Sequence, residues 1–329
     1  MEAGNHGVAV PPPFDPELRA ALTAVGAVAR EPVTPENLAA WQARDAATRP
    51  RPTVEALRDG GRFEVAELDA AGVRLVSARP AGSHGPLPLL YYLHGGGLVT
   101  GNAWSVLPRL LRELAQPLGI AVVSVEYRPA PAAPYPAAVE DCFTGLRWTA
   151  GHAKRLGVDA GRVVAGGKSA GAGLAAALAL LTRDRGDPVP AGQLLLSPML
   201  DDRNDTFSAH QLAGHDTWDR TSNATAWQAA LGDRRGDRRG APDLPPYAAP
   251  ARAADLAGLP AAYIEVGSAE TFRDEAVAYA DAIWRAGREA ELHVWPGAFH
   301  GFDTFAPDAA LSRDALGARL RRLRRTLAR

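Results

Sequence analysis

The pattern of apolar and polar residues along the chain predicts strands that alternate with helices. Segments 62–68 and 72–80 alternate apolar and polar residues as half-buried strands do, and the short break between them favours a hairpin. Six further segments are expected to be strands: 87–93, 120–127, 162–166, 193–198, 261–267 and 291–295. The first three of these are apolar runs, which are typical of strands covered on both faces. Helical patterns between and after these strands occupy 106–118, 136–155, 170–183, 273–286 and 308–328.

This alternation predicts an α/β fold with a mostly parallel central sheet and helices on both of its faces. Two short helical patterns precede it at 16–29 and 35–46, the second with Thr34 as a candidate N-cap in front of Pro35. Residues 201–255 contain no clear strand, and we expect them to form an insertion over the C-terminal edge of the sheet. The tandem sequence GDRRGDRRG within the insertion is interpreted as a solvated loop rather than an anion site.

Composition narrows the class of protein. The chain has 329 residues, enough for one large domain or two small ones, and its net charge of −1 at pH 7 gives no indication of nucleic-acid binding. Cys142 is the single cysteine, which excludes an intramolecular disulfide and fits a reducing compartment. The longest apolar run, 174–181, is too short to span a bilayer, and the N-terminus lacks a signal-peptide pattern. We therefore expect a soluble, cytoplasmic protein.

The sequence AGGKSAGAG at 165–173 is compatible at first sight with two different sites. A phosphate-binding loop with Lys168 as its lysine would need a glycine at position 162, where the chain has Arg162. The pattern G-x-S-x-G is present at 167–171, between a predicted strand and a predicted helix, which is the context of a nucleophile elbow. Ser169 is therefore the candidate nucleophile, although this motif alone leaves an inert serine in a glycine-rich turn about equally plausible.

A serine nucleophile needs a general base and an acid that orients it, and in hydrolases of this type the chain order is serine, acid, histidine. Glu270 follows the predicted strand at 261–267, and His300 follows the one at 291–295. Asp274 is a competing acid, but we expect it in the first turn of a helix, where a carboxylate is favoured by the helix dipole. The sequence thus predicts Ser169, Glu270 and His300 as catalytic residues.

Upstream of these residues, His94-Gly95-Gly96-Gly97 follows the predicted strand at 87–93. Glycines allow backbone N–H groups to approach a developing oxyanion without obstruction by side chains. We predict the amides of Gly95, Gly96 and Ala170 as the oxyanion hole. His94 is expected to support this loop by hydrogen bonding rather than to act as the base.

Other candidates are weaker. Trp104 and Trp218 are candidates for walls of the substrate pocket, with core packing an equally good interpretation of each. The remaining histidines show no metal-ligand spacing, so we expect no metal and no cofactor. Cys142 is expected in the core.

The motifs together resemble those of the hormone-sensitive-lipase-like α/β-hydrolases, the bacterial family IV esterases. The matching segments follow the family order: HGGG (94–97), EYRPAPAAPYPAAVEDC (126–142), GKSAG (167–171), SPMLDDRN (197–204), GSAETFRDE (267–275) and ELHVWPGAFHGFD (291–303). The resemblance implies an α/β-hydrolase domain over 51–329 and a helical cap built from 1–50 and 201–255. It also implies a carboxylesterase acting on small-molecule esters with short to medium acyl chains, in many members as a homodimer.

Three positions depart from the family pattern. Lys168 stands where the family usually has aspartate, Ala172 where glycine is commoner, and Glu270 where aspartate is more frequent. Glutamate can hold the imidazole as aspartate does. Lys168 is either a tentative pocket residue, which tunes the electrostatics or binds an acidic part of the substrate, or a lysine that points into solvent.

The expected reaction is acyl transfer to water in two steps through an acyl-enzyme on Ser169. The same serine chemistry would also serve a deacetylase, an amidase or an acyltransferase acting on a specific biosynthetic intermediate, and the sequence does not separate these activities. A binding protein that has lost catalysis is disfavoured because the serine, the acid and the histidine are all present.

Overall fold

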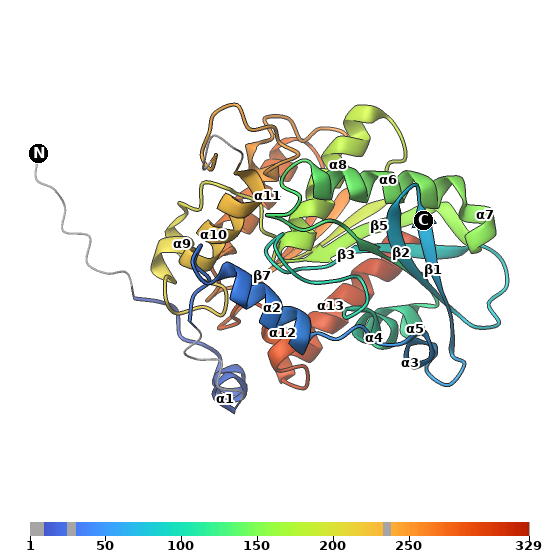
Figure 1. Ribbon diagram of the computed structural model, residues 1–329, viewed down its shortest axis with the longest axis horizontal. Coiled ribbons are helices and arrows are strands. Elements are labelled where there is room, and N and C mark those ends of the chain that lie inside the picture. Colours follow the sequence, from blue (N-terminus) through green and yellow to red (C-terminus); the bar gives the residue numbers. More distant parts are fainter. Residues whose placement is uncertain (1–9, 25–30, 233–237, 329) are drawn as a thin grey trace, which may run out of the picture.

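The computed structural model describes residues 10–24, 31–232 and 238–328, and it has a single eight-stranded sheet at its centre (Figure 1). The strand order is β1-β2-β4-β3-β5-β6-β7-β8. The strands have these bounds: β1 Phe63–Ala70, β2 Val73–Pro80, β3 Leu87–Leu93, β4 Ala121–Glu126, β5 Val158–Lys168, β6 Gly192–Leu196, β7 Ala261–Gly267 and β8 Ala290–Trp295. The α/β-hydrolase fold predicted from the sequence is confirmed.

The sheet is parallel from β4 through β8, whereas β1 pairs with β2 and β2 with β4 in antiparallel fashion. Leu93 at the end of β3 pairs with Gly167 near the end of β5, and Lys168 pairs with Leu196 at the end of β6. Because these strands end at the same level, the loops that follow them meet at one edge of the sheet. The segments at 94–97 and 169–171 therefore become neighbours.

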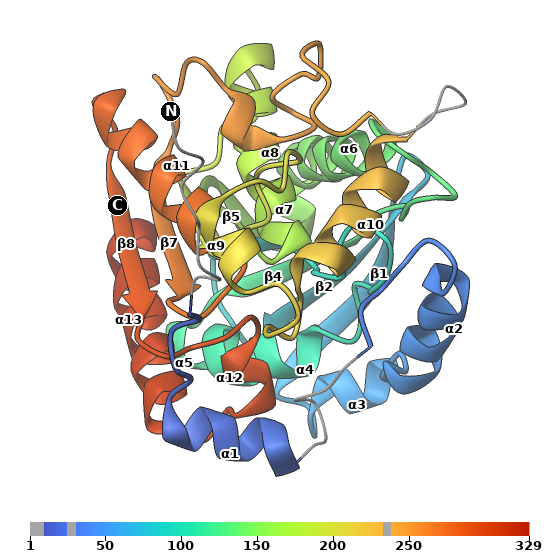
Figure 2. The ribbon, with the colours of Figure 1, turned by 90° about the vertical axis from the view of Figure 1, so that its left-hand side faces the viewer.

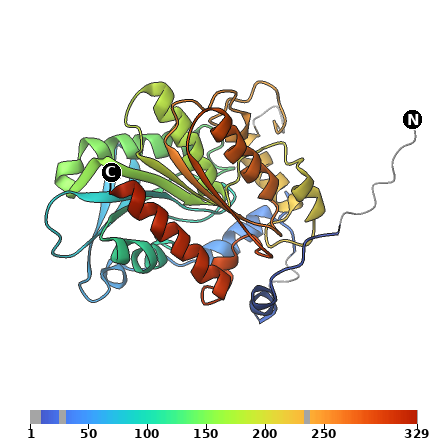
Figure 3. The same cartoon turned by 180° about the vertical axis from the view of Figure 1, so that it is seen from behind.

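Helices cover both faces of the sheet, as Figure 3 shows for α13 on one of them. The helices over the main domain are α3 Val54–Arg58, α4 Leu107–Leu110, α5 Gln116–Leu118, α6 Ala137–Gly151, α7 Ala153–Leu156, α8 Ala170–Arg185, α11 Arg273–Arg285, α12 Phe302–Phe305 and α13 Ala310–Leu327. A π-helical turn, Leu111–Ala115, joins α4 to α5. Side chains of β3 alternate between the two cores, Tyr91 packing on the side of α6 and α8 and Tyr92 on the side of α4 and α13.

Several local predictions need correction. The strand predicted at 162–166 extends over Val158–Lys168, and the helix predicted at 136–155 divides at His152 into α6 and α7. The short helices α3 and α12 were not predicted. The second N-terminal helix begins at Leu38 with Asn37 as its N-cap, so the predicted cap at Thr34 is wrong. The Thr34 amide instead donates to Asn37 Oδ1 at 2.8 Å, which closes a turn.

The N-terminal helices and the insertion lie beside the C-terminal edge of the sheet (Figure 2). Their helices are α1 Pro16–Ala24, α2 Leu38–Thr48, α9 Phe207–Gln211 and α10 Arg220–Leu231, with a 3₁₀ turn at Pro250–Arg252. Residues 25–30 of the first predicted helix and most of the GDRR repeat (233–237) lie outside the described residues.

The two segments contact each other, and we call residues 31–50 and 201–255 the cap segments. The Val33 amide donates to Ser222 Oγ at 3.0 Å, and Thr225 Oγ1 donates to the Val33 carbonyl at 2.9 Å. The rings of Trp41 and Trp218 pack with centroids 5.9 Å apart. In the described part of the chain, no helix is both long and apolar enough to cross a membrane.

Candidate active site

Ser169 occupies a sharp turn between β5 and α8. Its backbone has φ 59° and ψ −125°, a conformation that is strained for any residue with a Cβ. The flanking glycines are required sterically: a Cβ on Gly167 would lie 2.3 Å from the Gly171 carbonyl carbon, and one on Gly171 would lie 2.0 Å from the Leu93 carbonyl oxygen. The predicted G-x-S-x-G pattern therefore forms the turn that a nucleophile elbow needs.

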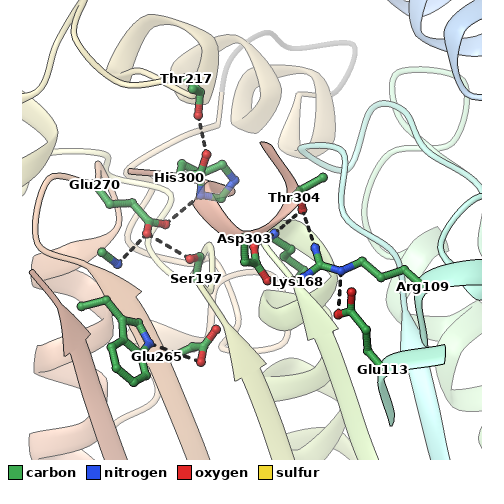
Figure 4. A network of polar contacts seen from close by, with 12 residues as sticks. Arg109, Glu113, Lys168, Ser197, Thr217, Glu265, Glu270, His300, Asp303 and Thr304 are labelled. Carbon is green, nitrogen blue, oxygen red and sulfur yellow. Dashed lines mark hydrogen bonds and ion pairs between the residues drawn. The ribbon is translucent and has the colours of Figure 1, made fainter. Parts of the chain in front are cut away.

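The predicted acid and base are in direct contact (Figure 4). Glu270 follows β7 and is fully buried, and its Oε1 lies 2.7 Å from Nδ1 of His300, in the loop after β8. The other oxygen of Glu270 accepts hydrogen bonds from the Gly267 amide at 2.7 Å and from Ser197 Oγ at 3.0 Å. These donors hold the carboxylate in one orientation, so that the ring of His300 is oriented in turn. Ser169 and His300 line the same cavity.

The competing acid does not reach this pair. Asp274 lies in the first turn of α11, as expected, and its carboxylate accepts a hydrogen bond from the Ser208 amide at 2.7 Å.

A second carboxylate beside the acid–base pair was missed by the sequence reasoning. Asp216, in the insertion, accepts hydrogen bonds from the backbone amides of His300 and Thr271, both at 2.9 Å. Thr217 Oγ1 donates to the His300 carbonyl, and Thr271 Oγ1 donates to the Trp218 carbonyl at 2.8 Å. Burial raises the pKa of Asp216 to about 6, while the nearby His300 acts against this rise. No periodicity or motif marks Asp216 in the sequence.

The HGGG loop lies against the elbow. A Cβ on Gly95 would lie 2.8 Å from the Lys168 carbonyl oxygen, and one on Gly96, whose φ is 130°, would lie 2.2 Å from the Thr100 carbonyl oxygen. Within the described residues, the amides of Gly95 and Gly96 have no hydrogen-bond acceptor. Ala170 begins α8, where an amide has no acceptor inside its own helix. All three predicted donors are thus available to a ligand.

His94 supports this loop. Its Nδ1 lies 3.0 Å from the Gly95 carbonyl oxygen, and its ring stacks on Tyr127, with centroids 4.1 Å apart. The Tyr127 hydroxyl also donates to the His94 carbonyl at 2.8 Å. Burial lowers the pKa of His94 to about 4, so the ring is neutral at physiological pH. These contacts fit the supporting role expected of His94 rather than the role of a base.

A cavity of about 540 Å³ surrounds the elbow. Its wall includes Trp218, which also packs in the core on the side of α8, so the two interpretations of this residue are both compatible with the structure. Trp41 of α2, which the sequence reasoning did not single out, lines the cavity as well. Trp104 is not among the lining residues, and it packs in the core on the α4 side of the sheet. Cys142 is buried in the opposite core, as expected. The described residues contain no group of three or more His, Cys, Asp or Glu that could hold a metal ion.

Comparison with known proteins agrees with this geometry. Residues 90–304 match the family model of the alpha/beta hydrolase fold. This chain belongs to that family. It is 35% identical to esterase LipI of Mycobacterium tuberculosis over 221 residues, and the aligned region covers 67% of each chain. It is 36% identical to an acetyl-hydrolase of Streptomyces hygroscopicus over 240 residues, and the aligned region covers 72% of this chain and 75% of that protein.

Among solved structures, a bacterial heroin esterase is similar with a TM-score of 0.85. It is 37% identical in sequence, and the similarity covers 95% of this chain and 98% of that one. The resemblance to hormone-sensitive-lipase-like α/β-hydrolases, which rested on motifs alone, is confirmed.

Lys168 is one of the three departures from the family pattern, and the structure shows what surrounds it. Its Nζ forms an ion pair with Asp303 and donates to Thr304 Oγ1 at 2.6 Å, both in α12 (Figure 4). The same carboxylate accepts a hydrogen bond from Arg109 at 3.1 Å and forms an ion pair with Arg319 at 2.7 Å. These three cations hold the pKa of Asp303 well below its usual range. Lys168 is therefore directed into the protein and lines the cavity, and the expectation of a solvent-pointing lysine is wrong.

Proposed function

We propose that this protein is a serine carboxylesterase that hydrolyses small-molecule esters with short to medium acyl chains through an acyl-enzyme on Ser169. The observation that carries the proposal is the 2.7 Å contact between Glu270 and His300 Nδ1, at strand ends that border the cavity of the serine elbow. Ester hydrolysis is also the activity in the names of the relatives, which include esterase LipI and the heroin esterase.

The geometry supports a two-step acyl transfer. Glu270 holds the Nδ1–H tautomer of His300, which leaves Nε2 free to take the proton of Ser169 as its Oγ attacks the ester carbonyl. The imidazolium that forms is stabilised by the buried carboxylate and then protonates the leaving alcohol. Water repeats the sequence on the acyl-enzyme and releases the acid.

The negative charge that develops on the carbonyl oxygen needs fixed donors. The amides of Gly95, Gly96 and Ala170 are proposed as these donors, because they come from two adjoining loops beside Ser169. Loss of a single donor of this kind typically slows turnover by about a hundred- to a thousand-fold. Since no side chain contributes, the glycines have to be retained for the amides to approach.

The cavity supports a limited acyl length. Its volume of about 540 Å³ has to hold both the acyl and the alcohol parts of an ester. Its wall on the side of α4 and α12 is also charged, which disfavours a long alkyl chain there. Removal of an acetyl group from a larger molecule is a second candidate, favoured by the similarity to the acetyl-hydrolase.

The test is hydrolysis of p-nitrophenyl esters from acetate to laurate by the wild type, Ser169→Ala and a control, Ser83→Ala, whose hydroxyl donates to the Pro80 carbonyl far from the elbow. We expect turnover that is greatest for short acyl chains, abolished by Ser169→Ala and retained by Ser83→Ala. Labelling of Ser169 by a fluorophosphonate without ester turnover would instead favour an amide substrate or an acyl acceptor other than water. Equal turnover by both variants would refute the proposal.

A further inference from the structure

The cavity around Ser169 has one wall of polar and charged side chains. It is formed by side chains of β3, β5, α4, the π-helical turn after α4, α12 and α13. Its donors come from Tyr92, Lys168, Thr304 and two arginines, Arg109 and Arg319, and its carboxylates are Asp303 and Glu113; we call these residues the polar wall. Trp41 and Trp218 line the cavity from the cap segments. The polar wall borders the same cavity as Ser169 and His300. Figure 4 shows the contacts among Lys168, Asp303 and Thr304.

The hydrogen-bonding capacity of the polar wall is unbalanced towards donors. Asp303 accepts from Lys168 through one oxygen and from Arg109 through the other, which also forms an ion pair with Arg319. Glu113 accepts from Arg109 Nε at 2.7 Å, and Glu265 accepts from Arg319 Nε at 2.9 Å, so the acceptor sites of the carboxylates are largely occupied. Thr304 Oγ1 accepts from both Lys168 and Arg109. A lysine ammonium and an arginine guanidinium carry more N–H groups than these contacts use, and neither can accept a hydrogen bond. The donors that remain at this wall need acceptors from water or from a ligand.

Tyr92 adds a neutral donor to the same wall. The residue is only 5% exposed, and its hydroxyl has no hydrogen-bond partner in the described part of the chain. Its neighbour Tyr91, on the opposite face of β3, donates to the Cys142 carbonyl at 2.9 Å. Burial raises the pKa of Tyr92, and Asp303 adds to this rise, so the hydroxyl keeps its proton. Because Tyr92 lines the cavity and its hydroxyl makes no hydrogen bond to the described residues, this donor is available to water or to a ligand.

We propose that the polar wall is a subsite for a hydrogen-bond acceptor on the substrate, a carbonyl, ether or carboxylate oxygen, bound by Tyr92, Lys168 and Arg109. This inference rests on the proposed esterase function and adds the substrate class: esters that carry a second oxygen group a few bonds from the scissile carbonyl. A purely alkyl chain would leave the donors of the wall unsatisfied, because it would displace water without replacing its hydrogen bonds.

Two matched pairs of esters test this proposal. The first pair, p-nitrophenyl 4-oxopentanoate and p-nitrophenyl pentanoate, differs by one carbonyl in the acyl part. The second pair, 4-oxopentyl acetate and pentyl acetate, has the same difference in the alcohol part. We expect the wild type to favour the oxo ester in one pair by about tenfold or more in kcat/KM, and the pair that responds identifies the part of the substrate on the polar wall.

The variants Tyr92→Phe and Lys168→Met assign the preference to this wall. We expect Tyr92→Phe to lower the oxo-to-alkyl ratio about three- to tenfold and Lys168→Met to lower it about tenfold or more, since a charged donor forms the stronger hydrogen bond. Tyr91→Phe is the matched control: it removes a neighbouring hydroxyl that does not line the cavity, and it should leave the ratio unchanged. Because each result is a ratio within one variant, a partial loss of folded protein does not affect it.

Absence of an oxo preference in both pairs, or a preference that persists in both Tyr92→Phe and Lys168→Met, would overturn the subsite. Either result leaves the proposed esterase function standing if the wild type hydrolyses the pentanoate and Ser169→Ala does not. Failure of the wild type on all four esters, with Ser169 unlabelled by a fluorophosphonate, would overturn both proposals.

Discussion

Buried carboxylates lie on two sides of His300 and are stabilised in opposite ways. Glu270 and Asp216 interact with neutral donors: backbone amides, the Ser197 hydroxyl and the ring of His300. Asp303, only three residues beyond His300, is surrounded by the side chains of Lys168, Arg109 and Arg319. We call the first group the relay carboxylates and Asp303 with its three cations the ion cluster.

The difference shows how charge can be divided in one site. Neutral donors stabilise a carboxylate without adding a permanent positive charge that would oppose a protonated His300. The relay carboxylates therefore remain able to respond when the imidazole takes up a proton. In the ion cluster, permanent cations already compensate the carboxylate, so its contribution is to join β5, α4, α12 and α13 around the cavity. We expect the loss of charge from a relay carboxylate to lower mainly turnover. Loss of charge from the ion cluster should lower mainly the stability of the fold.

The largest expected effect is on turnover. Glu270→Gln retains the shape of the side chain but removes the charge that holds His300 in its tautomer, and we expect kcat to fall by about 10⁴-fold, as for the equivalent change in other serine hydrolases. The matched control is Glu275→Gln, because Glu275 is also buried but accepts its hydrogen bond from the Leu200 amide at 2.7 Å. Steady-state kinetics on p-nitrophenyl butyrate compare the two variants. Equal losses of kcat would show that the orientation of His300 does not depend on Glu270.

The next effect is on stability. Asp303→Asn removes the anion paired with Lys168, whereas Arg109 keeps Glu113 and Arg319 keeps Glu265. Breaking a buried ion pair in this way typically costs about 3–5 kcal/mol. Urea unfolding should therefore show a lower free energy of unfolding than in Asp281→Asn, which breaks an exposed pair with Arg285 and should cost less than about 1 kcal/mol.

A double variant sharpens this prediction. Lys168→Met removes one of the cations, so Lys168→Met/Asp303→Asn should recover part of the stability lost in Asp303→Asn. If Asp303→Asn and Asp281→Asn unfold at the same urea concentration, the ion cluster does not stabilise the fold, and the contrast with the relay carboxylates fails.

The sequence predicts the serine, the acid and the histidine much better than it predicts the ion cluster. Ser169, Glu270 and His300 follow strands whose apolar runs are visible in the sequence, and parallel strands bring such residues to one edge. The ion cluster could not be predicted, because Asp303 belongs to a four-residue helix that has no sequence pattern of its own. Trp104 and Trp218 look alike in the sequence and are both packed in a core, and only the folded structure shows that Trp218 also lines the cavity whereas Trp104 does not.

Asp216 is the hardest residue to foresee, since it lies in an insertion without periodicity and acts through backbone amides of two other loops.

Asp216→Asn still accepts from one amide, but its NH₂ group cannot accept from the other. We expect kcat to fall about tenfold with KM little changed, because the variant loosens the loops that hold Glu270 and His300. Asp205→Asn, at an exposed carboxylate of the insertion paired with His210, is the control.

Stability as a function of pH gives a second measurement, which tests the burial of this carboxylate independently of turnover. The pKa of Asp216 is about 6 in the folded protein and near 3.8 in the unfolded chain, so the folded state takes up this proton first. As pH falls from about 6 to 3.8, the wild type should gain as much as about 3 kcal/mol of unfolding free energy relative to Asp216→Asn. Asp205→Asn, which keeps Asp216, should show the same gain relative to Asp216→Asn. If the wild type and Asp216→Asn instead follow parallel curves and share one kcat, the cap does not act on His300 through this carboxylate.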